Sequence, residues 1–316
     1  MALVKSNPKV SILIVSYNTK DLTRRCIQSI FEQTEADYEL IIWDNASTDG
    51  SAEALSEAFP DIHVIACEDN LGFGPACNRL AEMATGEYLL LLNPDTVVLD
   101  HAIDNLLAFA ERRPEAKIWG GRTVNNDGTL NHTAAMREVT LWSLFCRMTG
   151  LSSVLAGNSM FDREHYAGNR FDGDTPVDVV IGCFFLTPRH FYASLGGFDE
   201  AYFMFGEEVD LCMRARQAGA RPMVTTHATI IHHVGASDTV AERRQIRLLK
   251  GRMRLMRKHW TAPKRQLGIL LTQAIPLSRL WASWLLSRVK PTEKNRTTYE
   301  THRRIWAARS DWLPGY

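Results

Sequence analysis

The sequence has few cysteines, and none in a spacing that would hold a metal or a disulfide framework. Its six cysteines are scattered, and no two form a C-x-x-C pair. This spacing argues against a zinc site and against a disulfide-rich fold. A reducing, cytosolic compartment is the simplest interpretation. The stretch MALVKSNPK at the start lacks the apolar core of a signal peptide, which also favours a cytoplasmic protein.

Several catalytic and nucleotide-binding motifs are also missing. No G-x-x-x-x-G-K-[ST] loop, H-E-x-x-H pair or G-x-S-x-G elbow occurs in the sequence. The stretch NLGFGPAC begins like a G-x-G-x-x-G fingerprint, but Cys77 stands where the third glycine belongs. The sequence therefore favours none of the P-loop, dinucleotide-binding, zinc-peptidase or serine-hydrolase classes.

The formal net charge of the chain is zero, but basic and acidic residues are distributed unequally along it. Residues 240–316 hold 18 Lys/Arg and 4 Asp/Glu, whereas residues 1–239 hold 18 Lys/Arg and 32 Asp/Glu. Such an asymmetry predicts an acidic working domain followed by a basic extension with an anionic partner. We therefore expect one domain over 1–239 and a second, helical region over 240–316.

Short apolar runs alternate with amphipathic segments over the first 112 residues, at the spacing of βαβ units. This pattern predicts an α/β fold with a mostly parallel sheet and helices on both faces. The expected strands are Val10–Tyr17, Tyr38–Trp43, His63–Ala66 and 89–92, and the expected helices are Asp21–Gln33, Ser47–Phe59, Gly72–Ala84 and Ala102–Arg112.

The pattern is less regular after residue 118. Asn125–Thr129 is a hairpin turn, and residues 138–170 show no clear period, so we interpret them as a mobile insertion on the acceptor side. Beyond it we expect a strand over Val177–Leu186, a helix over Glu207–Ala218 that ends at Gly219, and one or two short strands over Met223–His232.

The C-terminal region combines a basic segment with an apolar one. Arg243–Arg265 holds ten Lys/Arg and no acidic residue, and the segment after it is rich in Trp and Leu. Pro276 and Arg279 interrupt that segment, which makes it a poor membrane span. The pair is typical of helices that lie on an anionic membrane surface. The alternative is that the apolar stripe packs on the protein. No nucleic-acid-reading module accompanies the basic stretch, so we expect no nucleic-acid partner.

Polar clusters follow three of the predicted strands. In open α/β sheets, ligands bind beyond the carboxyl ends of the strands. Any one cluster is more typical of a turn or a helix cap, but three at equivalent strand ends favour a binding site. The clusters contain Ser16, Tyr17 and Asn18, then Asp44 and Asn45, and then Asn93 and Asp95.

A fourth cluster lies at the start of the predicted helix 207–218. Glu207, Glu208 and Asp210 are three carboxylates in four residues, and the pair His232–His233 follows about 25 residues later. Acids in a first turn are favoured by the helix dipole alone, which explains one or two of them. A carboxylate held ionised there could also accept a proton from a hydroxyl, and a His with an Asp could hold a divalent ion.

Taken in order, these stretches resemble the family 2 inverting glycosyltransferases of the GT-A fold, and among them the bacterial rhamnosyltransferase-like branch. The resemblance spans about residues 8–238. It rests on the ordered set VSILIVSYN, DNASTDGS, NLGFGPACN, LLLLNPDT, GGFDEAYFMFGEEVDLCMRARQAG and HHVGAS. Each piece alone is loose, whereas the ordered set is specific.

The resemblance implies roles for individual residues. Asp44 is similar to the carboxylate that binds the pyrimidine ring of the donor. Asp95 is similar to the last residue of the D-x-D metal motif, in which Asn93 replaces the first Asp, and His233 in H-x-G-x-S is similar to a further ligand of a Mg²⁺ or Mn²⁺ ion. The loop around the nucleoside and the lining of the donor pocket would come from Ser16 and Asn18, and from Asn70, Gly72 and Asn78.

The catalytic base is where the sequence departs from the family. The usual motif is Glu-Asp, with its second residue as base, and here that residue is Glu208. Its side chain is one methylene longer, and a displacement of about 1 Å can cost ~10²-fold in rate. We expect Glu208 to be the base, with Glu207 or Asp210 as the alternatives; Asp210 is more typical of a structural residue that holds an Arg.

The resemblance implies transfer of a sugar, with rhamnose or another hexose favoured, from a dTDP- or UDP-linked donor to a glycan or lipid-linked acceptor. The enzyme would lie on the cytoplasmic face of a bacterial inner membrane. Two alternatives stay open. A nucleotidyltransferase would need a Gly-rich basic loop after the first strand, which SYNTKDL does not provide. A non-catalytic, membrane-associated scaffold with a degenerate site is favoured only by the departure at Glu208.

Overall fold

The computed structural model describes residues 8–131, 134–164, 166, 173–233 and 240–316. The chain forms two compact units. The described part of the first comprises residues up to 136, 173–203 and 207–233, and that of the second comprises 137–166, 204–206 and 240–316. Residues 234–237 of the H-x-G-x-S motif lie outside the described residues.

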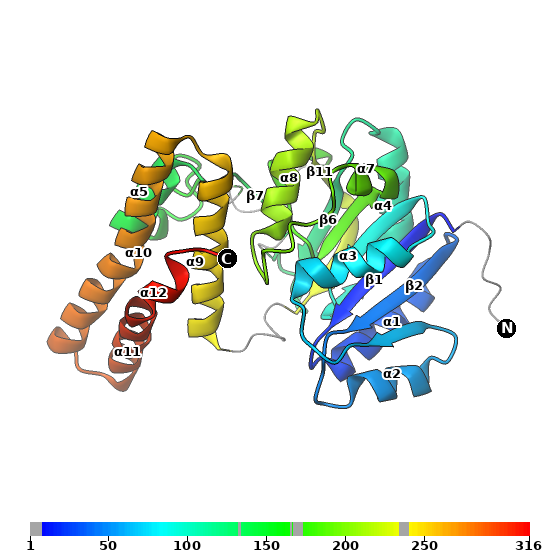
Figure 1. Ribbon diagram of the computed structural model, residues 1–316, viewed down its shortest axis with the longest axis horizontal. Coiled ribbons are helices and arrows are strands. Elements are labelled where there is room, and N and C mark those ends of the chain that lie inside the picture. Colours follow the sequence, from blue (N-terminus) through cyan, green and yellow to red (C-terminus); the bar gives the residue numbers. More distant parts are fainter. Residues whose placement is uncertain (1–7, 132–133, 165, 167–172, 234–239) are drawn as a thin grey trace. The chain divides into compact units, whose positions relative to one another are not determined.

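The first unit is built on a nine-stranded mixed sheet with the order β3-β2-β1-β4-β10-β6-β11-β5, to which β8 adds beside β11. The pairs β3–β2, β2–β1, β1–β4 and β6–β11 are parallel, and β10 runs antiparallel to both β4 and β6. Figure 1 shows the adjacent strands β1 and β2 in blue. The strands are β1 Val10–Ser16, β2 Tyr38–Asp44, β3 His63–Ala66, β4 Tyr88–Leu92, β5 Thr96–Val98, β6 Trp119–Val124, β8 Thr175–Pro176, β10 Phe184–Pro188 and β11 Met223–His232.

Strand β1 lies between β2 and β4, so the chain order reverses at β1. Successive strands run outward from β1 to β3, and then β4 returns to the other side of β1. At such a reversal the loops after the two flanking strands turn to opposite faces and leave a crevice at the carboxyl edge. The loops that carry Ser16 and Asn93 therefore border the expected binding edge.

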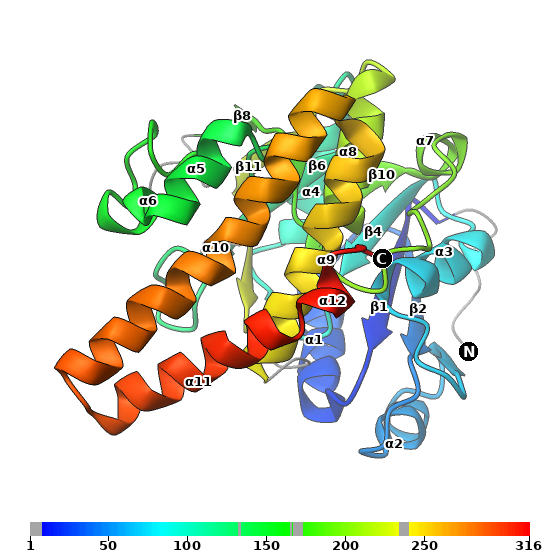
Figure 2. The ribbon, with the colours of Figure 1, turned by 60° about the vertical axis from the view of Figure 1, so that its left-hand side comes forward.

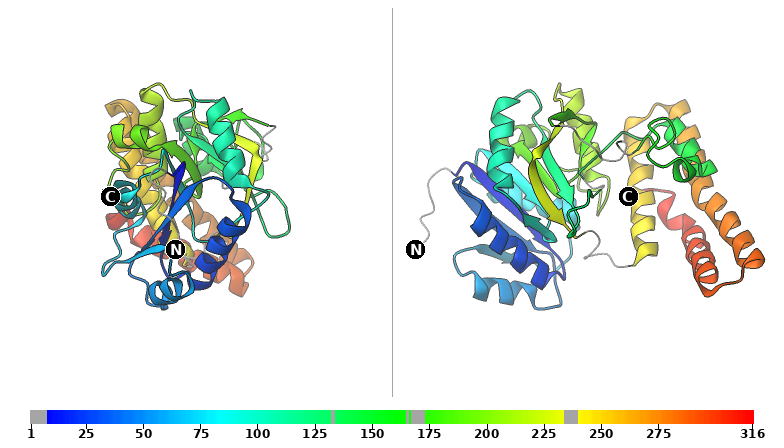
Figure 3. Two further views of the ribbon diagram at one scale, coloured as in Figure 1. Left: turned by 90° about the vertical axis from the view of Figure 1, so that its right-hand side faces the viewer. Right: turned by 180° about the vertical axis from the view of Figure 1, so that it is seen from behind.

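Helices cover both faces of this sheet. The side chains of Val10, Ile12 and Ile14 share a buried core with α1 and α4, while α3 contacts β1 and β2. In Figure 1 α3 lies in front of the sheet, and the view from behind in Figure 3 shows α1 and α4 on the other side. The helices are α1 Lys20–Gln33, α2 Ser51–Ala58, α3 Phe73–Met83, α4 Ala102–Arg112, α7 Arg189–Ser194 and α8 Glu207–Gln217.

Most predicted elements of this unit are confirmed to within a few residues, including the turn at 125–129, where the Gly128 amide donates to the Asn125 carbonyl. Two predictions were wrong. The helix expected from Ser47 begins at Ser51, because Ala46 and Gly50 have φ of 64° and 75° and break the helical path. The strand expected over Val177–Leu186 is two: β9 Val179–Val180, paired with β7 Ala135–Met136, and β10.

The second unit is helical. Its helices are α5 Leu141–Thr149, α6 Leu151–Val154, α9 Ala241–His259, α10 Ala262–Val289, α11 Glu293–Ala307 and α12 Arg309–Trp312. Helix α10 packs against α5, α9 and α11, as Figure 2 shows for α10 and α11. Leu144 of α5 belongs to the same apolar core as Met253, Ile275 and Trp312. The described part of the insertion thus contains two helices, and it groups with the C-terminal helices.

Helix α10 differs from the expected interrupted segment, because it runs unbroken through Pro276 for 28 residues. By length and composition alone, the helix could cross a membrane. Its most apolar stretch has a mean hydropathy of 1.2, and only 22% of that stretch is buried. Its buried residues Gly268, Thr272, Ile275, Pro276 and Ser283 follow helical spacing. The exposed Leu270, Trp281 and Leu285 lie on the opposite side, at 61%, 62% and 57% exposure.

Close packing at Gly121 gives the first prediction. A Cβ added to Gly121 in β6 would lie 2.3 Å from the Ala228 carbonyl oxygen and 2.6 Å from the Phe184 ring. We expect Gly121→Ala to lower the free energy of unfolding by about 1–3 kcal/mol through overpacking, measured by urea denaturation. Gly74→Ala is the control, because its Cβ would meet nothing closer than 3.4 Å. Equal stability of the two variants would contradict the packing described for β6.

Candidate active site

Asp44, the last residue of β2, is a buried carboxylate with one satisfied oxygen. Oδ2 accepts a hydrogen bond of 2.9 Å from the Ser47 amide, whereas Oδ1 is buried without a hydrogen bond in the described structure. A buried acceptor without a partner costs about 1–3 kcal/mol. A ligand N–H group that donates to Oδ1 would remove this cost, which fits a carboxylate that recognises a base edge.

The loops after β1, β2 and β3 are joined by hydrogen bonds from asparagine side chains. Asn18 Oδ1 accepts from the Thr48 amide at 2.7 Å, and Asn45 Nδ2 donates to Asn70 Oδ1 at 2.9 Å and to the Gly72 carbonyl at 3.1 Å. Asn18 and Ala46 also have positive φ, which is uncommon for residues other than glycine. Asn18, Asp44, Asn45, Asn70 and Gly72 thus belong to one bonded set of loops at the carboxyl edge.

Two other residues expected at the donor pocket make contacts inside the protein. The Ser16 hydroxyl is fully buried and lies 3.1 Å from the hydroxyls of both Thr19 and Thr23. The Asn78 amide accepts from the Tyr192 hydroxyl at 2.7 Å and from the Phe198 amide at 2.9 Å. Both side chains therefore hold loops in place through contacts inside the protein. Tyr17 is half-buried after β1.

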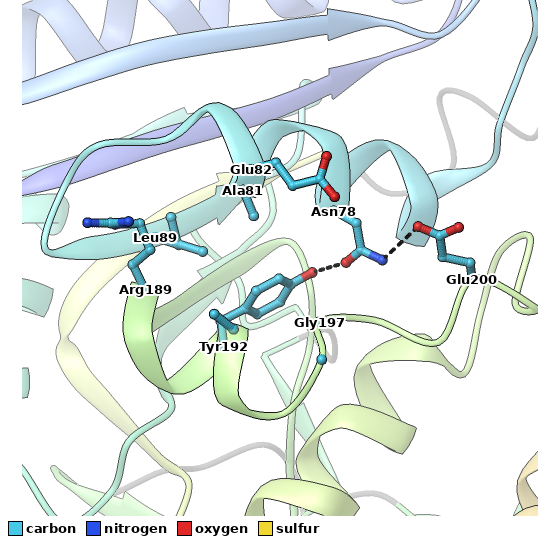
Figure 4. Close-up of a pocket in the computed structure, with 10 residues that line it drawn as sticks. Asn78, Ala81, Glu82, Leu89, Arg189, Tyr192, Gly197 and Glu200 are labelled. Carbon is cyan, nitrogen blue, oxygen red and sulfur yellow. Dashed lines mark hydrogen bonds between the residues drawn. The ribbon is translucent and has the colours of Figure 1, made fainter.

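A cavity of about 380 Å³ lies beside Asn78, away from the carboxyl ends of the strands. Figure 4 shows Tyr192, Asn78 and Glu200 joined across it by hydrogen bonds. Leu89, near the start of β4, lines this cavity, whereas Asp95 follows the end of the same strand. The cavity therefore belongs to the amino end of β4 and is separate from the binding edge.

Asn93, Asp95 and His232 come together at the ends of β4 and β11. His232 Nε2 lies 3.4 Å from Asp95 Oδ1 and 3.4 Å from Asn93 Nδ2. The side chains of Asp95 and His232 are only 6% and 7% exposed, and Asp95 Oδ1 makes no hydrogen bond among the described residues. Burial by itself would lower the pKa of the His232 imidazole, but Cys183 and Asp95 beside it raise that pKa to about 10.

This pair would fit a divalent cation once the imidazole gives up its proton, because a carboxylate oxygen then lies 3.4 Å from a neutral imidazole nitrogen. Among the described residues no group of three His, Cys, Asp or Glu side chains gathers for a metal, so phosphate and water oxygens would complete the shell. The sequence singled out His233, whose amide donates to the Asp95 carbonyl at 2.9 Å. His232 is the imidazole that reaches Asp95. The alternation of buried Ala228, Ile230 and His232 along β11 was the signal that could have identified it.

Glu207, the first residue of α8, is buried in the protein. Its side chain is adjacent to Gly74 of α3, and its Oε2 makes no hydrogen bond in the described structure. Burial, and next the charge of Glu208, raise the pKa of the Glu207 carboxyl well above its usual value. The raised pKa favours the neutral form of Glu207, which makes it a poorer proton acceptor than an accessible carboxylate.

Glu208 is the more accessible of the two glutamates, since its side chain is only partly buried at the amino end of α8. Phe205 and Gly206 just before the helix have φ of 70° and 106°, so the chain turns sharply there. A carboxylate in a first turn is stabilised in its ionised form by the helix dipole. This is the arrangement that a general base requires.

Asp210 holds an arginine, as a structural residue would. The Asp210 side chain is fully buried, and its Oδ2 accepts from Arg214 Nε at 2.8 Å. Arg214 in turn donates to the carbonyls of Leu195 and Gly197 at 2.6 and 2.8 Å. The pair fixes α8 to the turn after α7. Sequence reasoning did not identify Arg214, although its i,i+4 spacing from Asp210 was visible.

The family model of glycosyl transferase family 2 matches residues 11–175, just over half of the chain. The chain belongs to glycosyl transferase family 2. The matched segment contains the loops after β1, β2 and β4, and with them Asp44 and Asp95. The chain is thus a glycosyltransferase, and the resemblance of its motifs to that family is confirmed.

Similar proteins include several named rhamnosyltransferases. The N-acetylglucosaminyl-diphospho-decaprenol L-rhamnosyltransferase of Mycobacterium tuberculosis is 29% identical over 238 residues, which cover 70% of this chain and 75% of that protein. Rhamnosyltransferase WbbL of Escherichia coli K12 is 26% identical over 222 residues, which cover 67% and 78%. The rhamnosyltransferase-like character is thus confirmed.

A solved structure supports the fold. The mannosyltransferase PcManGT from Pyrobaculum calidifontis, in complex with GDP-Man and Mn²⁺, aligns with a TM-score of 0.56 and 16% identity over 98% of this chain and 88% of its own. At this identity the likeness concerns the fold alone. It confirms the expected fold class, a GT-A type α/β sheet followed by a helical region.

The raised pKa of Glu207 predicts a pH effect on stability. The folded protein holds this proton more tightly than the unfolded chain, whose glutamates titrate near pH ~4.3. The contribution of Glu207 to stability should therefore be greatest below that pH and be lost as the pH rises through the folded pKa. Glu207→Gln lacks this titration. The stability of Glu207→Gln relative to the wild type should thus increase with pH, measured by urea unfolding from pH 4 to 8.

The control for this measurement is Glu57→Gln, because the Glu57 side chain on α2 is exposed. Its stability should follow the wild type at every pH. Parallel pH profiles for the wild type and Glu207→Gln would show that Glu207 is ionised in the folded protein, and would return it to the candidates for the base.

Proposed function

We propose that this chain is a metal-dependent, inverting glycosyltransferase that moves rhamnose or another hexose from a dTDP- or UDP-linked donor to a hydroxyl of a lipid-linked glycan. The observation that carries the proposal is the pair of buried carboxylate oxygens, Oδ1 of Asp44 and of Asp95, that make no hydrogen bond in the described structure. Asp44 ends β2 and Asp95 follows β4, the strands on either side of β1.

Two features support the proposed binding of a pyrimidine nucleotide donor. Asp44 Oδ1 is buried without a hydrogen bond in the described structure, and it would accept one from the ring N–H of a uracil or thymine base. Asn18, Asn45 and Asn70 hold the surrounding loops, which orients the nucleoside without charge. A guanine base also carries a ring N–H, so the choice of a pyrimidine rests on the family resemblance.

Asp95 and one of the adjacent histidines would hold the divalent cation, which when bound neutralises charge on the diphosphate leaving group. Glu208 would take the proton of the acceptor hydroxyl as that oxygen attacks the anomeric carbon from the side opposite the diphosphate. The C–O bond to the diphosphate breaks as the new glycosidic bond forms, and the configuration inverts in this single displacement. No covalent enzyme intermediate is needed.

Charge and exposure in the second unit support a membrane-borne acceptor. Helix α9 is strongly basic, and the side of α10 opposite its buried residues exposes Leu270, Trp281 and Leu285. Trp and Leu beside Lys and Arg are typical of segments bound at an anionic membrane surface. The Mycobacterium relative is named for a decaprenol-linked substrate. We accordingly place the enzyme in the cytoplasm, at the membrane surface.

The assignment of the base is tested by Glu208→Gln. We expect sugar transfer to fall by at least ~10²–10⁴-fold because the proton acceptor is lost, while calorimetric binding of the donor nucleotide stays within about twofold of wild type. Glu300→Gln, an exposed acid on α11, is the control and should transfer normally. Loss of donor binding in Glu208→Gln, or loss of transfer only in Glu207→Gln, would refute the assignment.

The membrane assignment is tested by Trp281→Ala. Binding to vesicles that contain phosphatidylglycerol should weaken by about tenfold. A tryptophan ring that becomes buried in the lipid contributes on the order of 1–2 kcal/mol to binding. Phe31→Ala, which removes an aromatic ring 49% exposed on α1, should leave vesicle binding unchanged. Equal binding by the wild type and Trp281→Ala would show that α10 does not face the lipid.

A further inference from the structure

The chain joins the helical second unit for only three residues just before α8. Residues 204–206 group with the C-terminal helices, whereas Phe203 before them and Glu207 after them belong to the unit that contains the sheet. We call residues 204–206 the connecting turn. Helix α8 begins directly after it, and the second residue of α8 is the proposed base, Glu208. One residue therefore separates the connecting turn from the base.

Both ends of the connecting turn are fixed within the first unit. The Phe203 carbonyl accepts a hydrogen bond of 2.9 Å from the Phe73 amide at the start of α3, and Glu207 is buried. Between these ends, Phe205 and Gly206 have φ of 70° and 106°. A bulky residue such as phenylalanine rarely adopts this conformation unless surrounding contacts hold it there.

Helix α9 supplies one of those contacts at Gly251. A Cβ added to Gly251 would overlap the Phe205 carbonyl oxygen and would lie 3.7 Å from the Gly206 Cα. Glycine destabilises a helix interior relative to alanine, and Gly251 lies in the middle of a 19-residue helix. The close approach of the connecting turn explains why a glycine is there. Arg247, one turn earlier on the same face, has its Nη1 3.7 Å from Met204 Sδ.

The Tyr316 side chain supplies a second contact. Its hydroxyl donates to the Met204 carbonyl at 2.6 Å. Tyr316 is itself held against α9, because its carbonyl accepts from Arg254 Nη1 at 3.3 Å and Gly315 packs on the Arg254 backbone. The fully buried Trp312 anchors the same segment. Figure 1 shows the C-terminus beside α9.

Ordinary packing of the C-terminal segment explains part of this arrangement. Burial of Trp312 alone would dock the segment, and a hydroxyl that donates to a carbonyl is common in proteins. Ordinary packing does not explain why the contacts of Gly251 and Tyr316 both fall on the three residues that lead to Glu208. Nor does it explain why α9 lacks a side chain at that point.

We propose that Tyr316 and Gly251 are positioning residues, which hold the connecting turn and thereby fix the place of the Glu208 carboxylate. This inference rests on the proposed function, because it concerns the base assigned there. The backbone of the connecting turn sets the direction in which the first residues of α8 leave it. A displacement of about 1 Å near the reacting atoms can cost ~10²-fold in rate. The C-terminal helices thus contribute to the reaction without touching the substrate.

The first test uses the full chain and measures kcat and KM for sugar transfer from dTDP-rhamnose to N-acetylglucosaminyl-diphospho-farnesol, a short lipid-linked acceptor of the proposed kind. Tyr316→Phe removes only the hydroxyl. We expect kcat to fall by about tenfold and KM for the donor to stay within about twofold, because a displaced base weakens the transition state and not donor binding. Tyr299→Phe, on α11, is the control and should keep the wild-type kcat.

The second test compares Gly251→Ala with Gly268→Ala. Both glycines lie in helices of the second unit, and an added Cβ would overlap the Phe205 carbonyl at Gly251 but the Trp260 ring at Gly268. Both variants should therefore have a lower Tm. Only Gly251→Ala should lower the kcat of the folded enzyme, by about 10²-fold, because only this change displaces the connecting turn. Equal kcat in the two variants would overturn the role of Gly251.

Hydrogen–deuterium exchange tests the contact of Tyr316 without an activity assay. The amides of residues 204–208 should exchange about fivefold faster in Tyr316→Phe than in the wild type, the change expected when one hydrogen bond is lost. Exchange in Tyr299→Phe should match the wild type. Unchanged exchange or unchanged kcat in Tyr316→Phe, or a loss of activity that lies in KM, would overturn the proposal. Faster exchange in Tyr316→Phe, combined with a wild type that transfers no sugar, would retain the contact and reject the proposed function instead.

Discussion

The position of β1 between β2 and β4 is the constraint on which the candidate site depends. Because these strands are parallel, the ends of β1, β2 and β4 lie at one edge and present Asn18, Asp44 and Asp95 there. The antiparallel pairing of β5 with β11 then places Thr96 opposite His232 and brings that imidazole to Asp95. The hydrophobic runs that build the sheet thereby determine where the polar groups meet.

The polar groups at this edge differ in whether their hydrogen bonds are satisfied. Most loop groups are satisfied, as Asn45 and Asn70 illustrate, while Oδ1 of Asp44 and of Asp95 are buried without hydrogen bonds in the described structure. Groups left in this state destabilise the folded chain until a ligand binds them.

The sequence predicted the order of elements well, because alternation and helical period are local properties. It also predicted that Asp44 and Asp95 lie at the carboxyl ends of strands, since both come at the end of apolar runs. It could not show that Ser16 and Asn78 bond inside the protein, because those partners are set by tertiary packing. The helices within 137–167 were missed for a similar reason. Leu144 is buried only through contact with C-terminal helices distant in sequence.

The central claim is that Asp95 supports metal-dependent binding of a nucleoside diphosphate. Calorimetric titration with UDP, dTDP and GDP, with and without Mn²⁺, tests it on the wild type, on Asp95→Ala and on Asp127→Ala, an exposed hairpin carboxylate as control. We predict Mn²⁺-dependent binding of UDP or dTDP by the wild type and Asp127→Ala, lost in Asp95→Ala. Binding that is independent of Mn²⁺ or of Asp95, or no binding of any nucleotide, would contradict the account.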